Sequence, residues 1–378
     1  MSLELRPYQR EAIDTLYDWF RENSGNPLVV IPTAGGKSLI IAQFIREAMA
    51  YPDTRILVIT HVKELIAQNY AELIGIWPDA PAGIYSAGLG KRDIGSRIIF
   101  GGIQSIHRHA YTLQKVDLVL VDEAHLIPRN ADTMYGKFLS QLREINPYVK
   151  VVGFTATPYR LDSGRLDRGA DAVFQEIAYE ANIRDLIDAG YLCPPVSVGA
   201  LAQIDTTGIK TRAGDFIANA LEASAVDPDT VASLADEMVR HGQDRRGWLF
   251  FGCGIDHCTL MRDALRERGI VCESIFGETP SAERASIIGR FKRQEIRCLS
   301  SMGVLTTGFN ARHVDLIGVG RPTQSTGLWV QMVGRGTRLF PGKENCLILD
   351  FGGNIARHGP VDRPHPKREP AAGGPGGW

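Results

Sequence analysis

The sequence is poor in cysteine and has almost no net charge. Its 378 residues include six cysteines, none in a Cys-x-x-Cys pair, and the formal net charge is −1. The missing pairs exclude the usual zinc sites, and the balanced charge excludes binding to nucleic acid through an overall basic surface, although a local basic groove remains open. In "GCGIDHC", which holds Cys253, His257 and Cys258, we favour reduced thiols in a core over a metal site.

Long apolar runs are also missing. None approaches the roughly 18 apolar residues that a membrane span needs, and the first residues, "MSLELRPYQR", lack the apolar core of a signal peptide. We therefore expect a cytoplasmic protein without membrane contacts. The composition, 44% apolar and 22% charged, is that of a globular protein, and the length suffices for two domains with separate cores.

Short apolar runs alternate with amphipathic helical patterns along most of the chain, which is typical of parallel α/β domains. A stretch that breaks both patterns separates two such series, and the chain ends in a stretch rich in Pro and Gly. We predict α/β domains over residues 1–194 and 231–358, a linker or small insertion over 195–230, and a disordered tail over 359–378. A weak nucleic-acid contact is the alternative for the tail.

The segment "PLVVIPTAGGKSLIIAQFI" reads as a strand, a glycine turn and a helix. Backbone N–H groups at such a turn and at the start of the helix converge on an anion. Gly35 and Gly36 would let the backbone approach a phosphate, while Lys37 would reach the β- and γ-phosphates and Ser38 would bind Mg²⁺. A purely structural turn is the alternative, because Ile31 occupies the place of the first glycine of the strict phosphate-loop pattern.

A second candidate segment is "VDLVLVDEAH", an apolar strand that ends in two carboxylates. Parallel sheets present catalytic side chains at the carboxyl ends of their strands. Asp122 can hold Mg²⁺, and Glu123 can position and deprotonate an attacking water. A phosphate-binding turn, a metal ligand and a base for water are the parts that phosphoryl transfer to water needs.

These segments resemble, in order, the motifs of superfamily 2 helicases of the DEAD/DEAH-box type. "LRPYQREA" is similar to the adenine-reading Q motif, "PTAGGKS" to motif I, which tolerates Ile31, and "DEAH" to motif II. The resemblance implies two tandem RecA-like domains, each a mainly parallel sheet flanked by helices, with ATP and Mg²⁺ in the cleft between them. Ala34 departs from the family, which usually has glycine there. The implied nucleotide-binding residues are Arg6, Gln9, Thr33, Ala34, Gly35, Gly36, Lys37, Ser38 and Asn310.

Further segments resemble the motifs that contact nucleic acid or couple it to ATP. They are "ITHVKELIAQN", "GGIQSI", "TATP", "VLTTGFNA" and "QMVGRGTR". The implied nucleic-acid contacts are His61, Lys63, Gly102, Gln104, Ser105, Thr306 and Thr307, and which residue of 304–311 touches strand or ribose stays open. The implied coupling residues are His125, Thr155, Thr157 and Gln331, although His125 can equally be a core histidine. Arg335 and Arg338 would act as arginine fingers from one face of a helix over 325–338.

Within this superfamily the segments "LRPYQ", "HVKELIAQN", "HVDLI" and "CLILD" are most similar to the RadD-like DNA repair helicases, except that no cysteine-rich region follows Cys346. The resemblance implies an ATP-driven motor on single-stranded or branched DNA, without sequence preference, in repair or recombination. Single-strand-binding or repair proteins are candidate partners. A motor subunit of a restriction system, an RNA helicase and an ATP-gated nucleic-acid-binding module are the alternatives.

Overall fold

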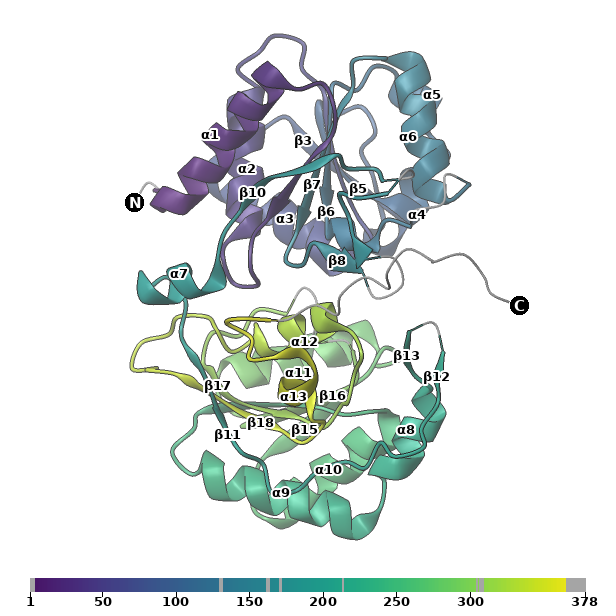
Figure 1. Cartoon of the computed structure of the whole chain (residues 1–378). Coiled ribbons are helices and arrows are strands. Elements are labelled where there is room, and N and C mark those ends of the chain that lie inside the picture. The colour runs from purple at the N-terminus through teal and green to yellow at the C-terminus, as the bar shows by residue number, and fades with distance from the viewer. Residues whose placement is uncertain are drawn as a thin grey trace, which may run out of the picture. The chain divides into compact units, whose positions relative to one another are not determined.

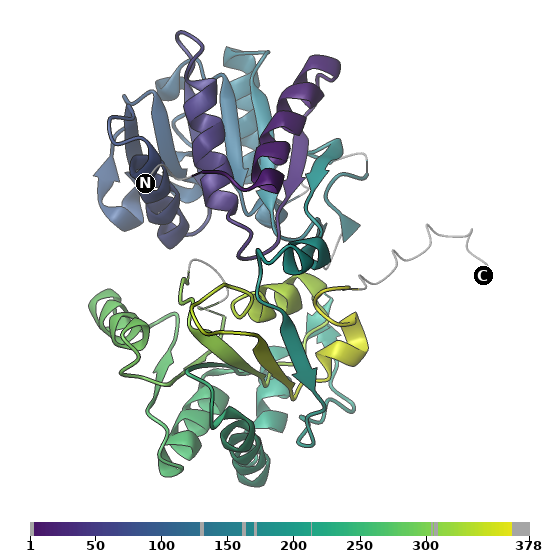
Figure 2. The ribbon, with the colours of Figure 1, turned by 90° about the vertical axis from the view of Figure 1, so that its left-hand side faces the viewer.

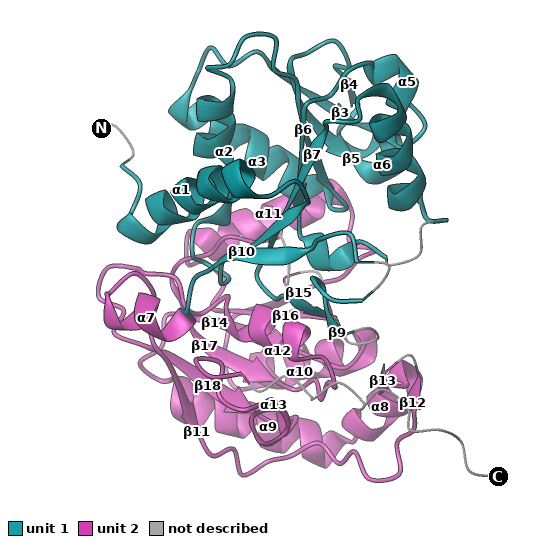
Figure 3. Cartoon of the chain, turned by 45° about the horizontal axis from the view of Figure 1, so that its top comes forward, with its two compact units in different colours: residues 1–182 teal, residues 183–378 magenta. Residues whose placement is uncertain are grey.

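The computed structural model describes residues 4–128, 132–160, 164–169, 172–212, 214–303, 305 and 309–364. The chain divides into two compact units, residues 1–182 (unit 1) and 183–378 (unit 2), which Figure 3 shows in two colours. Each unit is a RecA-like domain with a mainly parallel sheet flanked by helices. This confirms the predicted fold class.

The described part of unit 1 is built from strands, α-helices and two short 3₁₀ helices. Its helices are α1 (Pro7–Glu22), α2 (Lys37–Ala48), α3 (Lys63–Ile76), η1 (Ala87–Leu89), α4 (Ile103–Ile106), α5 (Ala110–Leu113), η2 (Ala124–Leu126) and α6 (Met134–Ile145). Its strands are β1 (Pro27–Val30), β2 (Ile56–Thr60), β3 (Ala82–Ser86), β4 (Lys91–Arg92), β5 (Ile98–Gly102), β6 (Leu118–Asp122), β7 (Lys150–Thr155), β8 (Tyr159–Arg160), β9 (Gly164–Arg165) and β10 (Glu176–Glu180).

The large sheet of unit 1 has the strand order β10-β1-β7-β6-β2-β5-β3-β4, in which the pairing of β3 with β4 is antiparallel. Helices α1, α2 and α3 lie on one side of it and α4, α5 and α6 on the other (Figure 1). The central strands are buried on both faces, as expected for apolar runs in a parallel sheet. Their carboxyl ends meet at one edge, where Val30 pairs with Thr155 and Thr60 with Gly102. Most of the predicted site residues of this unit follow these strand ends.

The described part of unit 2 contains a second sheet with helices on both faces. Its helices are α7 (Ile183–Asp188), α8 (Ala218–Ala225), α9 (Pro228–Gly242), α10 (Ile255–Glu267), α11 (Ser281–Lys292), α12 (Thr326–Val333) and α13 (Asn354–His358). Its strands are β11 (Pro195–Val198), β12 (Thr211–Arg212), β13 (Asp215–Phe216), β14 (Gly247–Phe251), β15 (Cys272–Ile275), β16 (Cys298–Ser301), β17 (Val314–Val319) and β18 (Cys346–Asp350).

The sheet of unit 2 is parallel throughout, in the order β11-β18-β17-β14-β16-β15. Strand β14 shows how it separates two cores, because successive side chains point to opposite faces. Trp248 and Phe250 pack with α8, α9 and α10, whereas Leu249 and Phe251 pack with α11 and α12. All four side chains are fully or almost fully buried.

The boundaries differ from the predicted ones at two places. The units separate after Asn182 and not after 194, and the predicted linker contains β11, which pairs in parallel with β18 over four residues. Figure 2 shows β11 in teal beside the yellow-green strands of unit 2. The segment 195–230 is therefore part of unit 2, because its apolar strand completes the sheet. Hydrophobic periodicity alone missed this strand, since its pattern is only half-buried.

The predicted tail begins too early. Val361 is buried in the core of unit 2 that α11 and α12 cover, and Asp362 forms an ion pair of 2.9 Å with Arg184 of α7. Residues 359–364 are therefore packed against unit 2, because one apolar side chain and one carboxylate find partners there. The rest of the predicted tail, 365–378, lies outside the described residues.

Candidate active site

The turn between β1 and α2 has the backbone geometry of an anion-binding loop. The φ angles of Ala34 and Gly36 are 71° and 78°, and the Gly35 N–H donates to the Pro32 carbonyl at 2.8 Å. Helix α2 begins at Lys37, and its first backbone hydrogen bonds run from the Leu39 and Ile40 N–H groups to the Gly36 carbonyl, at 3.0 and 3.2 Å. The N–H groups of Lys37 and Ser38 precede these bonds and lie at the positive end of the helix dipole. The left-handed conformation suits Gly36 but strains Ala34, where the family usually has glycine.

Helix α1 holds this turn in place. The Tyr8 hydroxyl donates to the Gly35 carbonyl at 2.6 Å, and Gln9 Nε2 donates to the same oxygen at 3.2 Å. Gln9 Oε1 accepts the Arg6 N–H at 2.9 Å, which closes a capping box at the start of α1. A Cβ on Gly36 would lie 2.4 Å from Gln9 Nε2, so a larger residue there would push this amide away from the Gly35 carbonyl. The tyrosine contact was not predicted, although Tyr8 stands next to Gln9 in the sequence.

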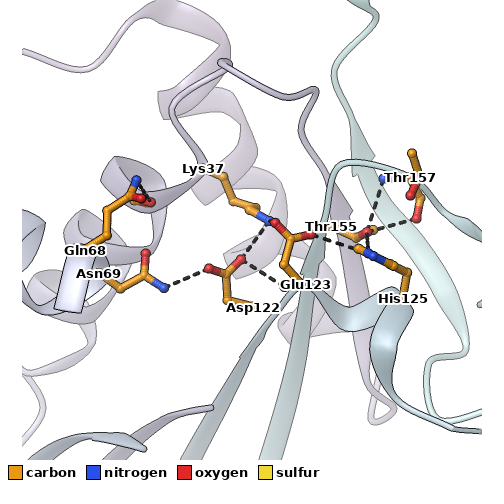
Figure 4. A network of polar contacts seen from close by, with 9 residues as sticks. Lys37, Gln68, Asn69, Asp122, Glu123, His125, Thr155 and Thr157 are labelled. Carbon is orange, nitrogen blue, oxygen red and sulfur yellow. Dashed lines mark hydrogen bonds and ion pairs between the residues drawn. The ribbon is translucent and has the colours of Figure 1, made fainter. Parts of the chain in front are cut away.

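Lys37 lies between the two carboxylates that end β6 (Figure 4). Its Nζ is 2.7 Å from Asp122 Oδ1 and 2.7 Å from Glu123 Oε1. Burial by itself would lower the pKa of Lys37, but the charges of Asp122 and Glu123 and their hydrogen bonds outweigh burial and raise it. The structure thus brings together the three predicted catalytic residues of unit 1, with a lysine that stays charged.

Helix α3 adds two polar side chains that sequence reasoning did not assign. Asn69, which is 1% exposed, donates from Nδ2 to Asp122 Oδ2 at 2.8 Å, and Gln68 Nε2 lies 3.4 Å from Ser38 Oγ (Figure 4). Asp122 is therefore fixed from both sides, by the ammonium group of Lys37 and the amide of Asn69. Asn69 belongs to the segment that resembles a nucleic-acid motif, yet its side chain points to Asp122, the predicted ligand of Mg²⁺.

The residues predicted to couple the site to nucleic acid form a second short network (Figure 4). Glu123 has a φ of 56°, a left-handed backbone that is uncommon for a side chain of this size and typical of functional sites. His125 Nδ1 lies 3.0 Å from Thr155 Oγ1 and 3.4 Å from Glu123 Oε2. The Thr155 hydroxyl donates to the Thr157 carbonyl and accepts the Thr157 N–H, at 2.9 and 3.1 Å. A continuous polar path thus joins Glu123 to Thr157.

The residues predicted to contact nucleic acid in unit 1 follow neighbouring strand ends. His61 and Lys63 come after β2, and Gly102 ends β5, directly beside Thr60 in the sheet. His61 Nδ1 lies 3.3 Å from the hydroxyl of Tyr135 in α6. Burial and the charge of Asp122 raise the pKa of this hydroxyl. In helix α4, Ser105 Oγ accepts the Ala87 N–H at 2.9 Å and Gln104 is exposed.

In unit 2 the predicted arginine helix is shorter than expected. Helix α12 ends at Val333, and the chain turns at Gly334, so Arg335 and Arg338 follow the helix and do not share a helical face. Arg335 is buried and donates to the Phe309 carbonyl at 3.0 Å and to the Gln331 carbonyl at 3.4 Å. The prediction of one face at i and i+3 was wrong because the regular helix ends at Val333, before either arginine.

Arg338 has a different electrostatic environment. Burial, together with the neighbouring charges of Arg335 and Arg312, lowers its pKa to about 9. Its Nη1 is buried and finds no hydrogen-bond partner among the described residues. Such a group is suited to an anion that it can bind. Asn310 is exposed, and Thr306 and Thr307 lie outside the described residues.

Comparison with known proteins identifies the family. Residues 2–160 match the family described as "Type III restriction enzyme, res subunit", and residues 231–339 match the "Helicase conserved C-terminal domain". The chain is 29% identical over 364 residues to IRC3 of Saccharomyces cerevisiae, a candidate ATP-dependent helicase, across 92% of this chain and 51% of that protein. It belongs to the superfamily 2 helicases.

A second relative agrees with this superfamily 2 helicase core, and two solved structures share its fold. The candidate mitochondrial helicase irc3 of Schizosaccharomyces pombe is 28% identical, across 94% of this chain and 58% of its own length. The Vibrio vulnificus fragment assigned to a type I restriction HsdR subunit has a TM-score of 0.71 and 22% identity, covering 95% of this chain and 67% of that chain. The Mycobacterium smegmatis helicase Lhr, bound to single-stranded DNA and AMP-PNP, has a TM-score of 0.63 and 16% identity. The match covers 92% of this chain and 46% of the Lhr chain.

The superfamily 2 core spans about half the length of the curated relatives it matches. The particular similarity to RadD-like helicases remains a prediction. None of the helices in the described part of the chain combines the length and the apolar character that crossing a bilayer requires.

Proposed function

We propose that this helicase core hydrolyses ATP and uses the energy to move along or remodel DNA, in repair or recombination. The observation that supports this most is the group of Lys37, Asp122 and Glu123 beside an anion-binding turn. A structural turn, the alternative reading of this segment, does not need a lysine held between two buried carboxylates. Burying charged groups is costly, and such a cluster is typical of functional sites.

The residues of unit 1 fit a nucleotide triphosphate and Mg²⁺. The turn offers backbone N–H donors and the dipole of α2 to phosphates, and Lys37 supplies a positive charge. Ser38 and Asp122 supply the hard oxygen ligands that Mg²⁺ prefers. When bound, Mg²⁺ would neutralise negative charge on the phosphates. Arg6, Gln9 and Thr33 would complete the nucleotide site.

Glu123 is the proposed base for the attacking water. Its carboxylate stands between the lysine and His125, so a shift of Lys37 toward phosphate would free Glu123 Oε1 to accept a proton from water. Thr155 and Thr157 would relay the state of this carboxylate along their hydrogen-bonded path. The core-histidine reading of His125 is less favoured, because the ring lies within 3.4 Å of the proposed base.

Arg335 and Arg338 are proposed to act on the phosphates from unit 2, and Gln331 is proposed to couple the ATP site to nucleic acid. A cation placed on the γ-phosphate stabilises charge in the transition state and is worth roughly 10³–10⁵ in rate in related phosphoryl transfers. The lowered pKa of Arg338 and its unbonded Nη1 support this role. Asn310 is proposed to touch the nucleotide from the same unit.

DNA is the proposed track, bound through its backbone. His61, Lys63, Gly102, Gln104 and Ser105 follow strand ends that are adjacent in the sheet, which supports one continuous strand-binding edge. Thr306 and Thr307 are proposed to extend the contact in unit 2. Backbone contacts carry little sequence information and weaken as salt rises, so we expect binding without sequence preference. Single-strand-binding or repair proteins are proposed as partners.

A restriction motor is the second candidate function, because residues 2–160 match a restriction-subunit family. It would use the same ATP site but serve a nuclease. An RNA helicase is the third. A cytoplasmic location remains our proposal, although the Schizosaccharomyces pombe relative is named as mitochondrial.

Steady-state ATP hydrolysis tests the proposal, measured alone and with single-stranded DNA, branched DNA, duplex DNA and RNA at two salt concentrations. We expect DNA with single-stranded parts to raise kcat several-fold, less so at high salt, and RNA to have little effect. Stimulation by RNA alone would contradict the DNA motor. Hydrolysis that no polynucleotide changes would favour a motor that is coupled to a protein partner.

A further inference from the structure

The segment before the arginines of unit 2 is held by a residue from the predicted linker. Strands β12 and β13 form a small antiparallel hairpin that belongs to neither large sheet. Asp215 of β13 accepts the hydroxyl of Thr323 at 3.0 Å with Oδ2 and the N–H of Gln324 at 2.8 Å with Oδ1. These two residues lie just ahead of helix α12, more than a hundred residues along the chain.

Thr323 is the centre of this connection. It is fully buried, its N–H donates to Asn354 Oδ1 at 3.0 Å, and its carbonyl lies 2.8 Å from His358 Nε2. Its hydroxyl accepts the N–H of Ser325 at 3.0 Å while donating to Asp215. Each of its three polar groups is therefore bonded, and Asp215 is the partner that comes from outside the helix α12–α13 region.

The connection continues into α12. Ser325 is the N-cap of this helix, and its Oγ accepts the Leu328 N–H at 3.2 Å. The helix is only eight residues long, so its start and its end are close to Arg335. Trp329 and Met332 pack into the core and fix which face is buried. The bonds at the start fix where the helix lies along its axis.

The far end of the same segment is fixed by other means. Lys343 Nζ donates to the carbonyl oxygens of Gly336 and Arg338 at 2.6 and 2.9 Å, and the Cys193 N–H donates to the Thr337 carbonyl at 2.7 Å. The segment 321–338 is thus anchored at both ends, and a shift at one end strains the other. A displacement of about 1 Å at a catalytic group can cost roughly a hundredfold in rate.

We propose that Asp215 is a positioning residue for the arginines of unit 2, so that the β12–β13 hairpin sets the rate of ATP turnover. This inference rests on the proposed ATPase function. Asp215 acts through Thr323, Ser325 and α12 and does not itself touch nucleotide. Substitutions in this hairpin, which was predicted as part of a linker, would then alter the rate of ATP turnover although they lie outside the family motifs.

Asp227 provides a matched control for the test. It caps α9 and accepts one hydroxyl and one backbone N–H, both from Thr230 and both at 2.8 Å. Asp215 accepts the same two kinds of donor and, in addition, the N–H of its neighbour Phe216 at 2.9 Å. Asp215→Ala and Asp227→Ala therefore remove the same kinds of hydrogen bond, but only the first loosens α12. Asp215→Asn keeps one oxygen acceptor for Gln324, and the Thr323 hydroxyl can turn to accept from the new amide.

The experiment measures kcat and KM for ATP in the three variants, with hydrogen exchange of residues 321–333. We expect Asp215→Ala to lower kcat about tenfold, which is the effect of losing about one hydrogen bond in the transition state. KM for ATP should stay within about twofold of the wild-type value. Exchange should quicken in 321–333, Asp215→Asn should recover most of kcat, and Asp227→Ala should leave kcat and this segment unchanged. Equal kcat in the two alanine variants, or a changed KM at constant kcat, would overturn the proposal.

Failure of the underlying function is recognised separately. If the wild-type chain hydrolyses ATP no faster than Lys37→Ala, the proposed function is wrong. Hydrogen exchange then decides the positioning proposal alone. Faster exchange in 321–333 for Asp215→Ala only would support the anchoring, and equal exchange in both alanine variants would overturn it.

Discussion

The two regions that carry the proposed catalytic cations balance charge in opposite ways. In unit 1, Lys37 lies 2.7 Å from each of two carboxylates, which raise its pKa. In unit 2, Arg338 has two other arginines nearby, its pKa is lowered to about 9, and its Nη1 has no hydrogen-bond partner among the described residues. In the first site the cation is fully paired and the three groups carry a net charge of −1, whereas the second site carries a surplus of positive charge.

This difference indicates what each region gains from a bound phosphate. Lys37 must exchange its carboxylate partners for phosphate oxygens, so binding is a replacement of one ion pair by another. Arg338 loses nothing when it meets an anion, because its group is desolvated and unbonded already. We therefore expect the two cations to respond differently to mutation, in activity and in stability.

Removal of the unit 1 cation should have the largest effect. We expect Lys37→Ala to lower ATP turnover by at least roughly 10³-fold, because it removes charge stabilisation of the transferred phosphate. It should also destabilise unit 1 by about 3 kcal/mol, since two buried carboxylates lose their shared partner. Steady-state kinetics and urea unfolding measure the two effects. Undiminished turnover would refute the assignment of the whole site.

Removal of the unit 2 cation should separate activity from stability. Arg338→Met keeps the apolar stem and removes the guanidinium group. We expect kcat to fall roughly a hundredfold, with little change in ATP affinity, while unit 2 becomes no less stable because an unsatisfied buried charge disappears. Arg338→Lys serves as the control for charge without the planar fork. A loss of affinity at constant kcat would argue against a role in the transition state.

Buried titratable groups extend the comparison to pH. Burial lowers the pKa of His257 in unit 2 from 6.5 to about 4, and its Nδ1 accepts the Cys253 N–H at 3.2 Å. Above pH 6.5 this histidine is neutral in the folded and the unfolded chain. As the pH falls toward about 4, the unfolded chain takes up the proton first, so stability is lost, by roughly 3 kcal/mol in all.

Urea unfolding of unit 2 at pH 7.5 and pH 5 measures this loss. His257→Asn keeps an acceptor for the Cys253 N–H but cannot titrate in this range. We expect a smaller fall in stability for this variant than for the wild type. The fall that remains comes from His313, because burial also lowers the pKa of this histidine. An equal fall in both proteins would show that His257 does not titrate on unfolding.

The sequence predicted the regular parts of the fold well, because these depend on local pattern. The apolar runs at 27–31, 116–121 and 314–320 each became a buried strand. Strand β10 was missed because its side chains are half-buried or exposed and give no apolar run. Helix α12 was predicted too long, although Gly334 stands where it ends.

The site was predictable only where a short segment carries the chemistry. Lys37, Asp122 and Glu123 lie in two such segments, and the structure brings Lys37 within 2.7 Å of both carboxylates. Their catalytic roles remain predictions. Asn69 could not be assigned, because only the fold shows that the second turn of α3 reaches Asp122. Asp215 gives no local signal at all, since its partners lie more than a hundred residues away.

The smallest expected effect concerns the strained turn of unit 1. Ala34 has a φ of 71°, a conformation that costs a side chain roughly 1–2 kcal/mol, whereas glycine loses about 0.4–1 kcal/mol through the greater freedom of the unfolded chain. We therefore expect Ala34→Gly to stabilise unit 1 by about 0.5–1 kcal/mol in urea unfolding. Gly36→Ala is the matched opposite, because its φ is 78° and its new Cβ would lie 2.4 Å from Gln9 Nε2. If Ala34→Gly stabilises the fold but lowers ATP affinity, the strain holds the turn ready for phosphate, and if affinity is unchanged, glycine and alanine serve the turn equally well.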